Sequence, residues 1–213
     1  MNRDIAGIRK DYILEKLNET DAAANAVDQF TRWWNEAMQS DIIEPNAMTL
    51  ATASTSGVPS ARIVLLKGYD ERGFVFFTNY TSHKGHEMEA NPHAALVFFW
   101  KELERQIRIE GIIEKVSKEE SDAYFYSRPA NSRIGAWASP QSEIIGSRDL
   151  LEENVKMYTG KFGENIPRPA HWGGYRVIPQ IIEFWQGRSN RLHDRLQYSM
   201  LQNGDWKIER LAP

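Results

Sequence analysis

The sequence feature that constrains the fold most is a series of short runs rich in β-branched and aromatic residues, each closed by Gly, Pro, Asp, Asn or Ser. Such runs are typical of β-strands joined by turns. Most segments between them are too short for the crossover helices that parallel strands require. The sequence therefore favours an antiparallel, closed or partly closed barrel over a doubly wound parallel sheet. The runs occupy residues 48–54, 60–69, 73–79, 93–100, 105–116, 175–187, 191–200 and 206–213.

Helical patterns lie before and between these runs, so the predicted fold class is mainly β with flanking helices. Apolar residues recur at helical spacing in the segment that follows Asp21. Ser82 is a predicted N-cap, and Ser117 with Glu120 has the spacing of a capping box. The first three strand-like runs are expected to form a meander. Helices are predicted weakly for residues 4–18, and more firmly after 21, over 82–91, from 117 and over 148–162.

Composition and charge exclude several classes of function. The chain has 26 basic and 29 acidic residues and a net charge of -3, which does not favour nucleic acid or an anionic membrane as a partner. The absence of cysteine excludes disulfides and thiolate metal sites. A G-x-G-x-x-G motif and a P-loop are also absent, so we expect no dinucleotide or nucleoside triphosphate bound in the usual Gly-rich way.

The chain shows no sign of a targeting or membrane segment. Its start lacks the apolar core of a signal peptide, and no apolar run approaches membrane-spanning length. We therefore expect a cytoplasmic protein. No repeat or linker is evident, so a single domain over residues 1–213 is expected, with residues 1–20 as a mobile N-terminal segment.

Lys84 is the clearest anomaly among the charged residues. It falls in the first turn of the predicted helix over 82–91, where the positive end of the helix dipole disfavours a cation by up to about 1 kcal/mol. A bound anion would remove that cost, because backbone N–H groups, the Ser82 hydroxyl and the Lys84 ammonium would together form a phosphate site. The alternative is a solvated lysine in a helix whose start is misplaced.

Two further segments place cations beside strand and helix patterns. In "RIVLLK", strand alternation puts Arg62 and Lys67 on opposite faces, and such residues usually mark where a strand leaves the core. In "YFYSRPANS", Tyr124, Arg128 and Ser132 follow one another at four-residue spacing, although a proline interrupts the helix. A bent segment would still allow these three side chains to converge on one anion.

The segment "NRLHDR", residues 190–195, places two arginines around a histidine in a chain that is acidic overall. On a strand, Arg191, His193 and Arg195 would share one face, where like charges repel unless an anion or solvent lies above them. Asp194 would point to the other face and is not a catalytic candidate. The alternative interpretation is an exposed edge strand whose charges prevent aggregation.

The histidines do not indicate a metal site. His83 and His86 lie three residues apart on a predicted helix, but no carboxylate or third histidine stands at a spacing that would complete a site. A Ser-His-Asp hydrolase is not supported either, because no G-x-S-x-G motif is present. We expect no metal.

Taken together, several segments resemble the pyridoxine/pyridoxamine 5'-phosphate oxidase family in its bacterial single-domain form, over about residues 9–213. The segments are "RIVLLKGYDERGFVFFTNYTSHKGHEMEANP", "ERQIRIEG", "YFYSRPANSRIGAWASPQS", "HWGGYRV", "IEFWQGRSNRLHDR" and "WKIERLAP". The resemblance implies an FMN-binding split β-barrel, antiparallel and Greek-key-like. It also implies a homodimer that holds FMN at the subunit interface.

The activity that the resemblance implies is an FMN-dependent oxidation in vitamin B6 metabolism. Pyridoxine 5'-phosphate and pyridoxamine 5'-phosphate would be converted to pyridoxal 5'-phosphate. A hydride would pass from the exocyclic carbon of the pyridine ring to the flavin, and O2 would reoxidise the flavin and be released as H2O2. The cofactor would carry the redox chemistry, while the protein would orient the substrate and hold two phosphates.

The resemblance further implies roles for individual residues. Arg191 and His193 would be catalytic and lie over the substrate ring. The FMN site would consist of Arg62, Ile63, Val64, Leu65, Leu66, Lys67, Phe77, Thr78, Lys84, Gln106, Gln141, Ser142, Trp185 and Arg195. The substrate would contact Arg9, Tyr12, Lys67, Tyr124, Arg128, Ser132, Arg191, Leu192 and His193.

The sequence departs from the family pattern at two positions. Phe77 stands where the family often has tyrosine, and His83 stands where it often has arginine. The second departure leaves Lys84 to carry more of the contact with the FMN phosphate.

Two alternative functions remain open. A flavin oxidase of the same fold with another substrate, as in phenazine biosynthesis, would have no use for a phosphate-binding group at Lys67 and "YFYSRPANS". A noncatalytic protein that binds FMN or pyridoxal phosphate would not need Arg191 and His193 over the reacting carbon.

Overall fold

The computed structural model describes residues 11–213. The predicted contact of Arg9 and the first part of the weak helix lie outside the described residues. The helices are α1 (Ala26–Gln39), α2 (His83–Ala90), α3 (Lys118–Ser127), α4 (Ala130–Ala138) and α5 (Asp149–Phe162). The strands are β1 (Ala47–Ala53), β2 (Pro59–Leu65), β3 (Gly68–Asp70), β4 (Gly73–Asn79), β5 (His93–Trp100), β6 (Arg105–Lys115), β7 (Trp172–Gln186), β8 (Asp194–Met200) and β9 (Trp206–Arg210).

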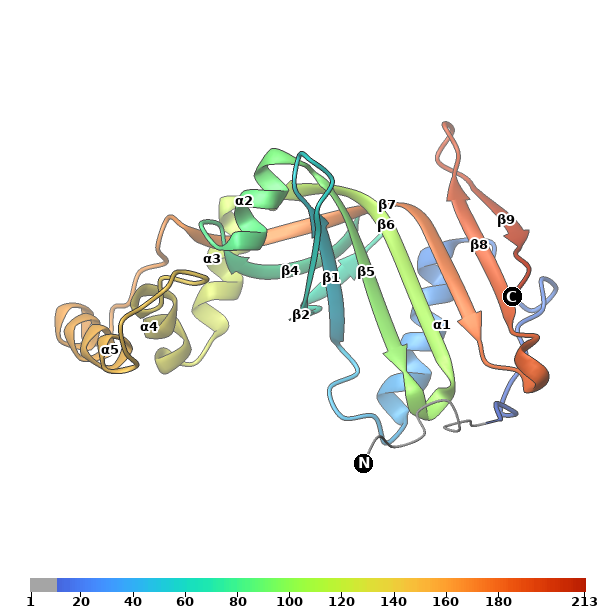
Figure 1. Ribbon diagram of the computed structural model, residues 1–213, viewed down its shortest axis with the longest axis horizontal. Coiled ribbons are helices and arrows are strands. Elements are labelled where there is room, and N and C mark those ends of the chain that lie inside the picture. The colour runs from blue at the N-terminus through green and yellow to red at the C-terminus, as the bar shows by residue number, and fades with distance from the viewer. Residues whose placement is uncertain (1–10) are drawn as a thin grey trace, which may run out of the picture. The chain divides into compact units, whose positions relative to one another are not determined.

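In the described part of the chain, nine strands form one sheet in the order β2-β1-β5-β6-β7-β4-β3, with β8 paired to β7 and β9 paired to β8. The pairs of β7 with β4 and with β8 are both antiparallel, as are β3 with β4 and β8 with β9. The helices lie outside the sheet and do not serve as crossover connections between parallel strands (Figure 1). The predicted class, a mainly β antiparallel split barrel with flanking helices, is confirmed.

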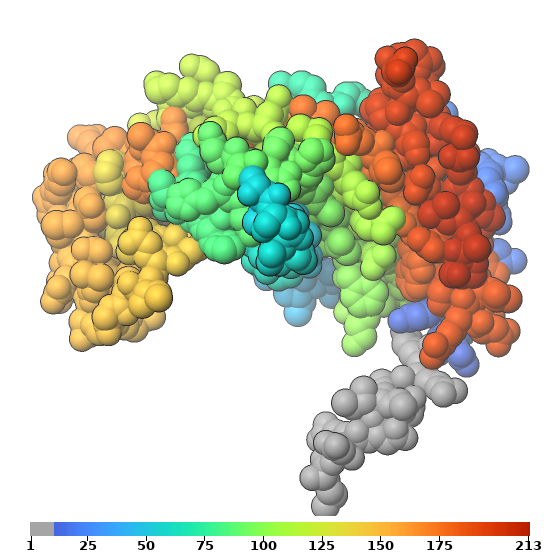
Figure 2. Space-filling model, turned by 45° about the horizontal axis from the view of Figure 1, so that its top comes forward, coloured from blue at the N-terminus to red at the C-terminus, as the bar shows by residue number. Residues whose placement is uncertain are grey.

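The predicted meander of the first three runs is wrong. β2 pairs with β1 at one end of the strand order, whereas β3 and β4 form a hairpin at the other end. Nearly every residue of β4 is buried, so this strand needs a neighbour on each side and takes β3 and β7. β2 alternates exposed and half-buried residues, and the β1–β2 hairpin lies at the surface (cyan in Figure 2).

The chain divides into two compact units. One contains the described residues up to 49, together with 96–110 and 179–213, and the other contains 50–95 and 111–178. The division falls within β1, β5, β6 and β7, each of which contributes residues to both units. The single domain that the sequence suggests stays a prediction.

In the first unit, α1 packs its apolar face against the sheet. Asn25 caps the helix by accepting from the backbone N–H of Val27 at 2.7 Å. The Phe30 ring lies 5.5 Å from the ring of Phe98 between centroids, and Trp33 meets a further phenylalanine edge-on. The predicted helix after Asp21 is therefore confirmed, and its spacing identified the buried face.

The weak helix predicted for residues 4–18 is wrong for its described part, residues 11–18. The backbone N–H groups of Ile13 and Leu14 donate to the Glu104 carboxylate at 2.9 and 3.2 Å, and that of Leu17 donates to Asp194 at 3.2 Å. These donors are thus satisfied by side chains distant in the sequence, one in the turn before β6 and one on β8, instead of by helical carbonyls.

In the second unit, the helices behave as their caps predict. Ser82 accepts from the Gly85 N–H and Ser117 accepts from the Glu120 N–H, so both predicted N-caps are confirmed. Only half of the capping box is seen, because the Glu120 carboxylate binds Arg176 at 3.1 Å. The helical run breaks at Pro129, where α3 gives way to α4.

Candidate functional site

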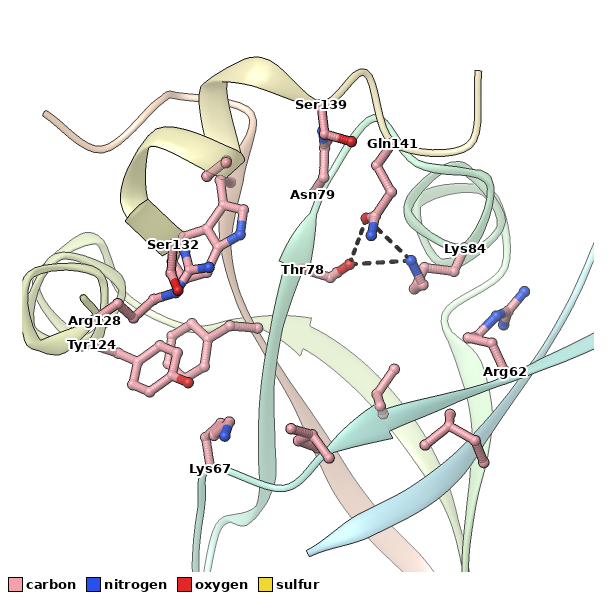
Figure 3. Close-up of a pocket in the computed structure, with 17 residues that line it drawn as sticks. Arg62, Lys67, Thr78, Asn79, Lys84, Tyr124, Arg128, Ser132, Ser139 and Gln141 are labelled. Carbon is pink, nitrogen blue, oxygen red and sulfur yellow. Dashed lines mark hydrogen bonds between the residues drawn. The ribbon is translucent and has the colours of Figure 1, made fainter. Parts of the chain in front are cut away.

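A cavity of about 640 Å³ lies within the second unit, a size typical of pockets for small organic ligands (Figure 3). Its walls are supplied by β2, β4, α2, α3, α4, the segments that follow β2 and α4, and the start of β7. The lining residues are Arg62, Ile63, Val64, Leu65, Lys67, Phe77, Thr78, Asn79, Lys84, Tyr124, Arg128, Ser132, Gly135, Ala136, Ser139, Gln141 and Trp172.

At one end of the cavity, Lys84 is held entirely by neutral groups. Its Nζ donates to Thr78 Oγ1 at 3.2 Å and to Gln141 Oε1 at 3.3 Å (Figure 3). It also donates to Ser82 Oγ at 3.2 Å. Burial lowers the pKa of the ammonium, and the neighbouring Arg62 guanidinium lowers it further. The solvated lysine considered from sequence is therefore wrong, because this side chain is buried with no acidic partner among the described residues.

Arg62 lies near the same end of the cavity as Lys84 (Figure 3). Strand alternation predicted that Arg62 and Lys67 face opposite sides, and this stays a prediction, because consecutive residues of β2 from Arg62 to Leu65 all line the cavity. β2 ends at Leu65, and the chain turns before β3 begins at Gly68. The alternation rule therefore does not reach Lys67.

At the other end, α3 and α4 bring Tyr124, Arg128 and Ser132 to one place, as the sequence predicted (Figure 3). The Arg128 guanidinium lies 4.6 Å from the centre of the Trp172 ring, a cation–π contact. Its Nη1 atom is buried without a hydrogen-bond partner among the described residues. Burial lowers the pKa of this guanidinium.

Aromatic rings and a second cation complete this end. Phe77 stacks on Tyr124 with ring centroids 4.0 Å apart and planes at 25°. The Lys67 Nζ lies 6.0 Å from the centre of the Tyr124 ring. A guanidinium with one buried, unpartnered N–H group and a nearby ammonium form a site for an anion, since a phosphate would satisfy both groups.

The charge of the cavity is one-sided. Its lining contains Arg62, Lys67, Lys84 and Arg128 but, among the described residues, no aspartate or glutamate. Two cations lie at each end (Figure 3). Each end of the cavity therefore offers positive charge to an anionic group.

A second group of predicted site residues lies in the first unit, around the C-terminal strands. Trp185 and His193 have ring centroids 4.6 Å apart, and Tyr12 lies 5.8 Å from Trp185 and 5.9 Å from His193. The backbone N–H of Arg188 donates to His193 Nδ1 at 3.1 Å. Because a backbone N–H can only donate, the neutral imidazole carries its proton on Nε2. Burial lowers the pKa of His193, Arg191 lowers it further, and Asp194 opposes both.

The single basic strand face expected for "NRLHDR" is wrong. Ser189–Arg191 is a turn of 3-10 helix in which Asn190 and Arg191 have φ of 55° and 61°, and β8 begins only at Asp194. Arg195 does not stand free above the sheet, because its Nε donates to the buried Glu183 carboxylate at 2.7 Å. Asp194 binds Arg188 at 3.0 Å and Arg210 at 2.9 Å, so its role is structural.

The other predicted contacts are placed as follows. Leu66 is buried but does not line the cavity. Gln106 lies on β6 in the first unit. Ser142 is exposed with φ of 75°, one residue beyond the cavity-lining Gln141. Leu192 is exposed.

Sequence reasoning missed five lining residues: Asn79, Gly135, Ala136, Ser139 and Trp172. A signal for three of them was present. Ser132, Gly135, Ala136 and Ser139 follow the spacing i, i+3, i+4 and i+7, which places them on one face of a helix. Trp172 belongs to the quoted "HWGGYRV", to which no role was given.

His83 has a carboxylate partner that sequence reasoning overlooked. Its Nε2 lies 3.0 Å from Glu87 Oε1, four residues along α2. His83 does not line the cavity. Across residues 11–213, no three histidine or acidic side chains are grouped to hold a metal ion. No helix in that range is long and apolar enough to cross a membrane.

Comparison with known proteins agrees with the geometry. The family model described as "Pyridoxamine 5'-phosphate oxidase" matches residues 34–160, and that described as "Pyridoxine 5'-phosphate oxidase C-terminal dimerisation region" matches 172–213. A protein named pyridoxine/pyridoxamine 5'-phosphate oxidase from Trichormus variabilis is 61% identical over all of both chains. One of the same name from Cupriavidus pinatubonensis is 59% identical, covering 98% of this chain and 99% of that one.

Solved structures show the same fold. PhzG from Burkholderia lata 383, solved with tetrahydrophenazine-1-carboxylic acid, has a TM-score of 0.88 and 32% identity over 94% of this chain and 99% of its own. A pyridoxamine 5'-phosphate oxidase-related, FMN-binding protein from Nostoc punctiforme has a TM-score of 0.72 and 16% identity, covering 90% of this chain and 100% of that one.

The fold and the cationic cavity define an FMN-dependent oxidoreductase built on a split β-barrel. Among the described residues, the Nη1 of Arg128 has no hydrogen-bond partner, and Lys84 is bound only by uncharged side chains. Both features fit a cofactor and a substrate that each carry a phosphate. The chain belongs to the pyridoxine/pyridoxamine 5'-phosphate oxidase family, and its C-terminal dimerisation region supports a homodimer.

Proposed function

We propose that the protein oxidises pyridoxine 5'-phosphate and pyridoxamine 5'-phosphate to pyridoxal 5'-phosphate, with O2 as the electron acceptor and H2O2 as the product. For the alcohol, the substrate loses two electrons and two protons, and O2 gains them. For the amine, water supplies the carbonyl oxygen and ammonia leaves. The observation that carries this proposal is the buried, unpartnered Nη1 of Arg128 in the cavity wall.

The end of the cavity with Arg128 is the proposed substrate phosphate site. Arg128 offers a guanidinium, Lys67 an ammonium, and Tyr124 and Ser132 offer hydroxyl groups. Together these groups satisfy the several acceptor oxygens of a phosphate. The stacked Phe77 and Tyr124 rings limit the access of water to this end, which strengthens the electrostatic attraction.

The end with Lys84 is the proposed FMN phosphate site. The Lys84 ammonium, the Arg62 guanidinium and the start of α2 all favour an anion there. FMN supplies the redox chemistry when bound, because its ring accepts the two electrons and the hydrogen that leave the substrate. Thr78 and Gln141 orient the lysine through hydrogen bonds rather than by charge.

The residues of the C-terminal group are the remaining proposed contacts. Arg191 and His193 are proposed to contact the substrate near the reacting carbon, with Leu192 between them. His193 presents an Nε2–H, since its Nδ1 accepts from the chain. Gln106, Ser142, Trp185 and Arg195 are proposed FMN contacts, and Arg9 and Tyr12 contacts of the bound substrate. FMN is proposed to lie at the interface of the homodimer, which the dimerisation region supports.

A phenazine-type oxidase is the second candidate, because PhzG has a similar structure. Its ligand, tetrahydrophenazine-1-carboxylic acid, carries no phosphate. Such a substrate would leave Lys67 and Arg128 without a dianionic partner. The cations at this end therefore favour the phosphorylated vitamers.

The test is to record the visible spectrum of the purified protein and to measure peroxide after adding pyridoxine 5'-phosphate. We expect a yellow protein that forms H2O2 with this substrate. Bound flavin without peroxide from either phosphorylated vitamer would disprove the activity. In the same assay, Arg191→Ala and His193→Ala are expected to lower turnover with FMN still bound.

A further inference from the structure

Glu87 of α2 is a buried carboxylate that lies behind the cavity wall and that the proposed chemistry does not use. Its Oε2 accepts from Thr52 Oγ1 at 2.6 Å, from Ser60 Oγ at 2.6 Å and from Arg62 Nη2 at 3.3 Å. Its Oε1 lies 3.0 Å from His83 Nε2. Both oxygens therefore have partners: Oε2 contacts side chains of β1 and β2, and Oε1 contacts a side chain of α2 itself.

The same contacts fix the guanidinium of Arg62. Its Nη2 also donates to Ser60 Oγ at 2.6 Å, and its Nη1 donates to Thr52 Oγ1 and to the Leu50 carbonyl. Glu87 thus receives both the arginine and the two hydroxyl groups that hold the arginine. If the carboxylate were lost, all three donors would lose their common acceptor.

Charge strengthens this arrangement. Burial pushes the pKa of Glu87 upward, but hydrogen bonds from Ser60, Thr52 and Arg62, with the charge of His83, bring it to about 2. The carboxylate is therefore ionised at any working pH. Arg62 lowers the pKa of Lys84, so the two cations repel each other at this end of the cavity. The negative charge of Glu87, which pairs with Arg62 on the side away from the cavity, offsets this repulsion.

We infer that Glu87 is a positioning residue for the flavin phosphate: its carboxylate holds the Arg62 guanidinium beside Lys84, at the wall of the cavity. His83 contacts Glu87 and not the cavity, so the residue before Lys84 acts on this carboxylate instead of on the ligand. This inference rests on the proposed FMN site and names the residue that orients one of its cations.

The experiment is a titration of the flavin-free full-length protein with FMN and, separately, with riboflavin, followed by flavin fluorescence. Glu87→Gln keeps the size of the side chain but removes its charge. We expect its Kd for FMN to rise about tenfold, the scale of a hydrogen bond to a charged group, with its Kd for riboflavin unchanged. The matched control is Glu89→Gln, two residues along α2, whose carboxylate binds only the surface Lys115 among the described residues. It should bind FMN as the parent does.

A double variant separates positioning from general stability. Glu87 acts through Arg62, so adding Glu87→Gln to Arg62→Ala should cause no further loss of FMN affinity. If Glu87→Gln does not fold, Ser60→Ala removes one donor of the network and should weaken FMN alone, by a smaller factor.

Several results would overturn the inference. Unchanged or tighter FMN binding by Glu87→Gln would show that the carboxylate does not position Arg62. Equal losses for FMN and riboflavin, or full additivity with Arg62→Ala, would show a merely structural role. If the parent protein itself does not bind FMN, the proposed function fails, and the inference fails with it.

Discussion

The cations of the cavity and those of the C-terminal region are bound in different ways. In the cavity, Lys84 contacts only neutral groups, and Arg128 has a buried Nη1 with no partner among the described residues. In the C-terminal region, three arginines each have a carboxylate partner: Arg188 binds Asp194 at 3.0 Å, Arg195 binds Glu183 at 2.7 Å and Arg210 binds Glu19 at 2.6 Å.

This difference separates cations that await an anion from cations that hold the chain together. A buried charge without a counter-charge destabilises the fold, so it persists only where a ligand uses it. A buried ion pair does not demand a ligand. The comparison therefore favours Arg128 and Lys84 as binding groups, and it makes Arg195 at least partly structural.

The largest effect is expected from Arg128→Met. The substitution removes the orphaned guanidinium but keeps an apolar side chain of similar length against Trp172. We expect KM for pyridoxine 5'-phosphate to rise about 100-fold, or about 2.7 kcal/mol, while the unfolding midpoint stays equal or rises. Steady-state kinetics and thermal unfolding measure the two quantities. A variant that loses stability and keeps its KM would show that Arg128 is structural, like the arginines of the C-terminal region.

The opposite pattern is expected from Arg195→Met. Glu183 is 3% exposed, so it would lose one of two cationic partners inside the protein and keep only Arg108. We expect a loss of about 2 kcal/mol in unfolding free energy, or roughly 4–8 °C in the midpoint of the flavin-free protein. Thermal unfolding of the flavin-free protein checks this. An unchanged midpoint would mean that the ion pair is not structural.

A smaller effect is expected from Lys67→Ala. The Lys67 ammonium has no carboxylate partner among residues 11–213, and it lies over the Tyr124 ring at the proposed substrate end. We expect KM for the phosphorylated substrate to rise about tenfold, with FMN retained. Lys115→Ala is the matched control, because that ammonium pairs with Glu89 at 2.7 Å outside the cavity. A shared change in both variants would remove the evidence for a phosphate contact.

The smallest effect is a pH dependence of stability from His193. Its pKa in the folded protein lies below the ordinary 6.5, so the unfolded chain binds the proton more readily. The stabilisation is full above pH 6.5 and is lost as pH falls below that value toward the lowered pKa. We expect the unfolding midpoint to drop less between pH 7.5 and pH 5.5 in His193→Gln than in the parent. Equal drops in both proteins would contradict the shift.

The sequence predicted the strands and helix caps because these depend on local patterns. The periodicity around Phe30 and the cap at Ser82 identified their helices. Two features were not predictable in this way. β4 pairs with the distant β7, and "NRLHDR" forms a turn with positive φ at Asn190 and Arg191. Each depends on tertiary contacts or on backbone strain, which the periodicity of residues along a strand or helix does not indicate.

The cavity itself was partly predictable. The convergence of Tyr124, Arg128 and Ser132 followed from their spacing and from the break at Pro129. The helical face that continues to Gly135 and Ala136 had the same spacing but consists of small residues, which carry no chemical signal of their own. Lys67 joined the cavity because a strand ended two residues earlier, and strand boundaries are the least certain part of a sequence-based prediction.

We expect Arg128 and Lys67, which have no carboxylate partner among the described residues, to select a phosphorylated substrate. The most direct measurement is kcat/KM for pyridoxine 5'-phosphate divided by kcat/KM for pyridoxine, in the parent and in Arg128→Met. We expect a large ratio in the parent that falls about 100-fold in the variant, because only the phosphorylated substrate loses a contact. A ratio that is the same in both proteins would contradict it.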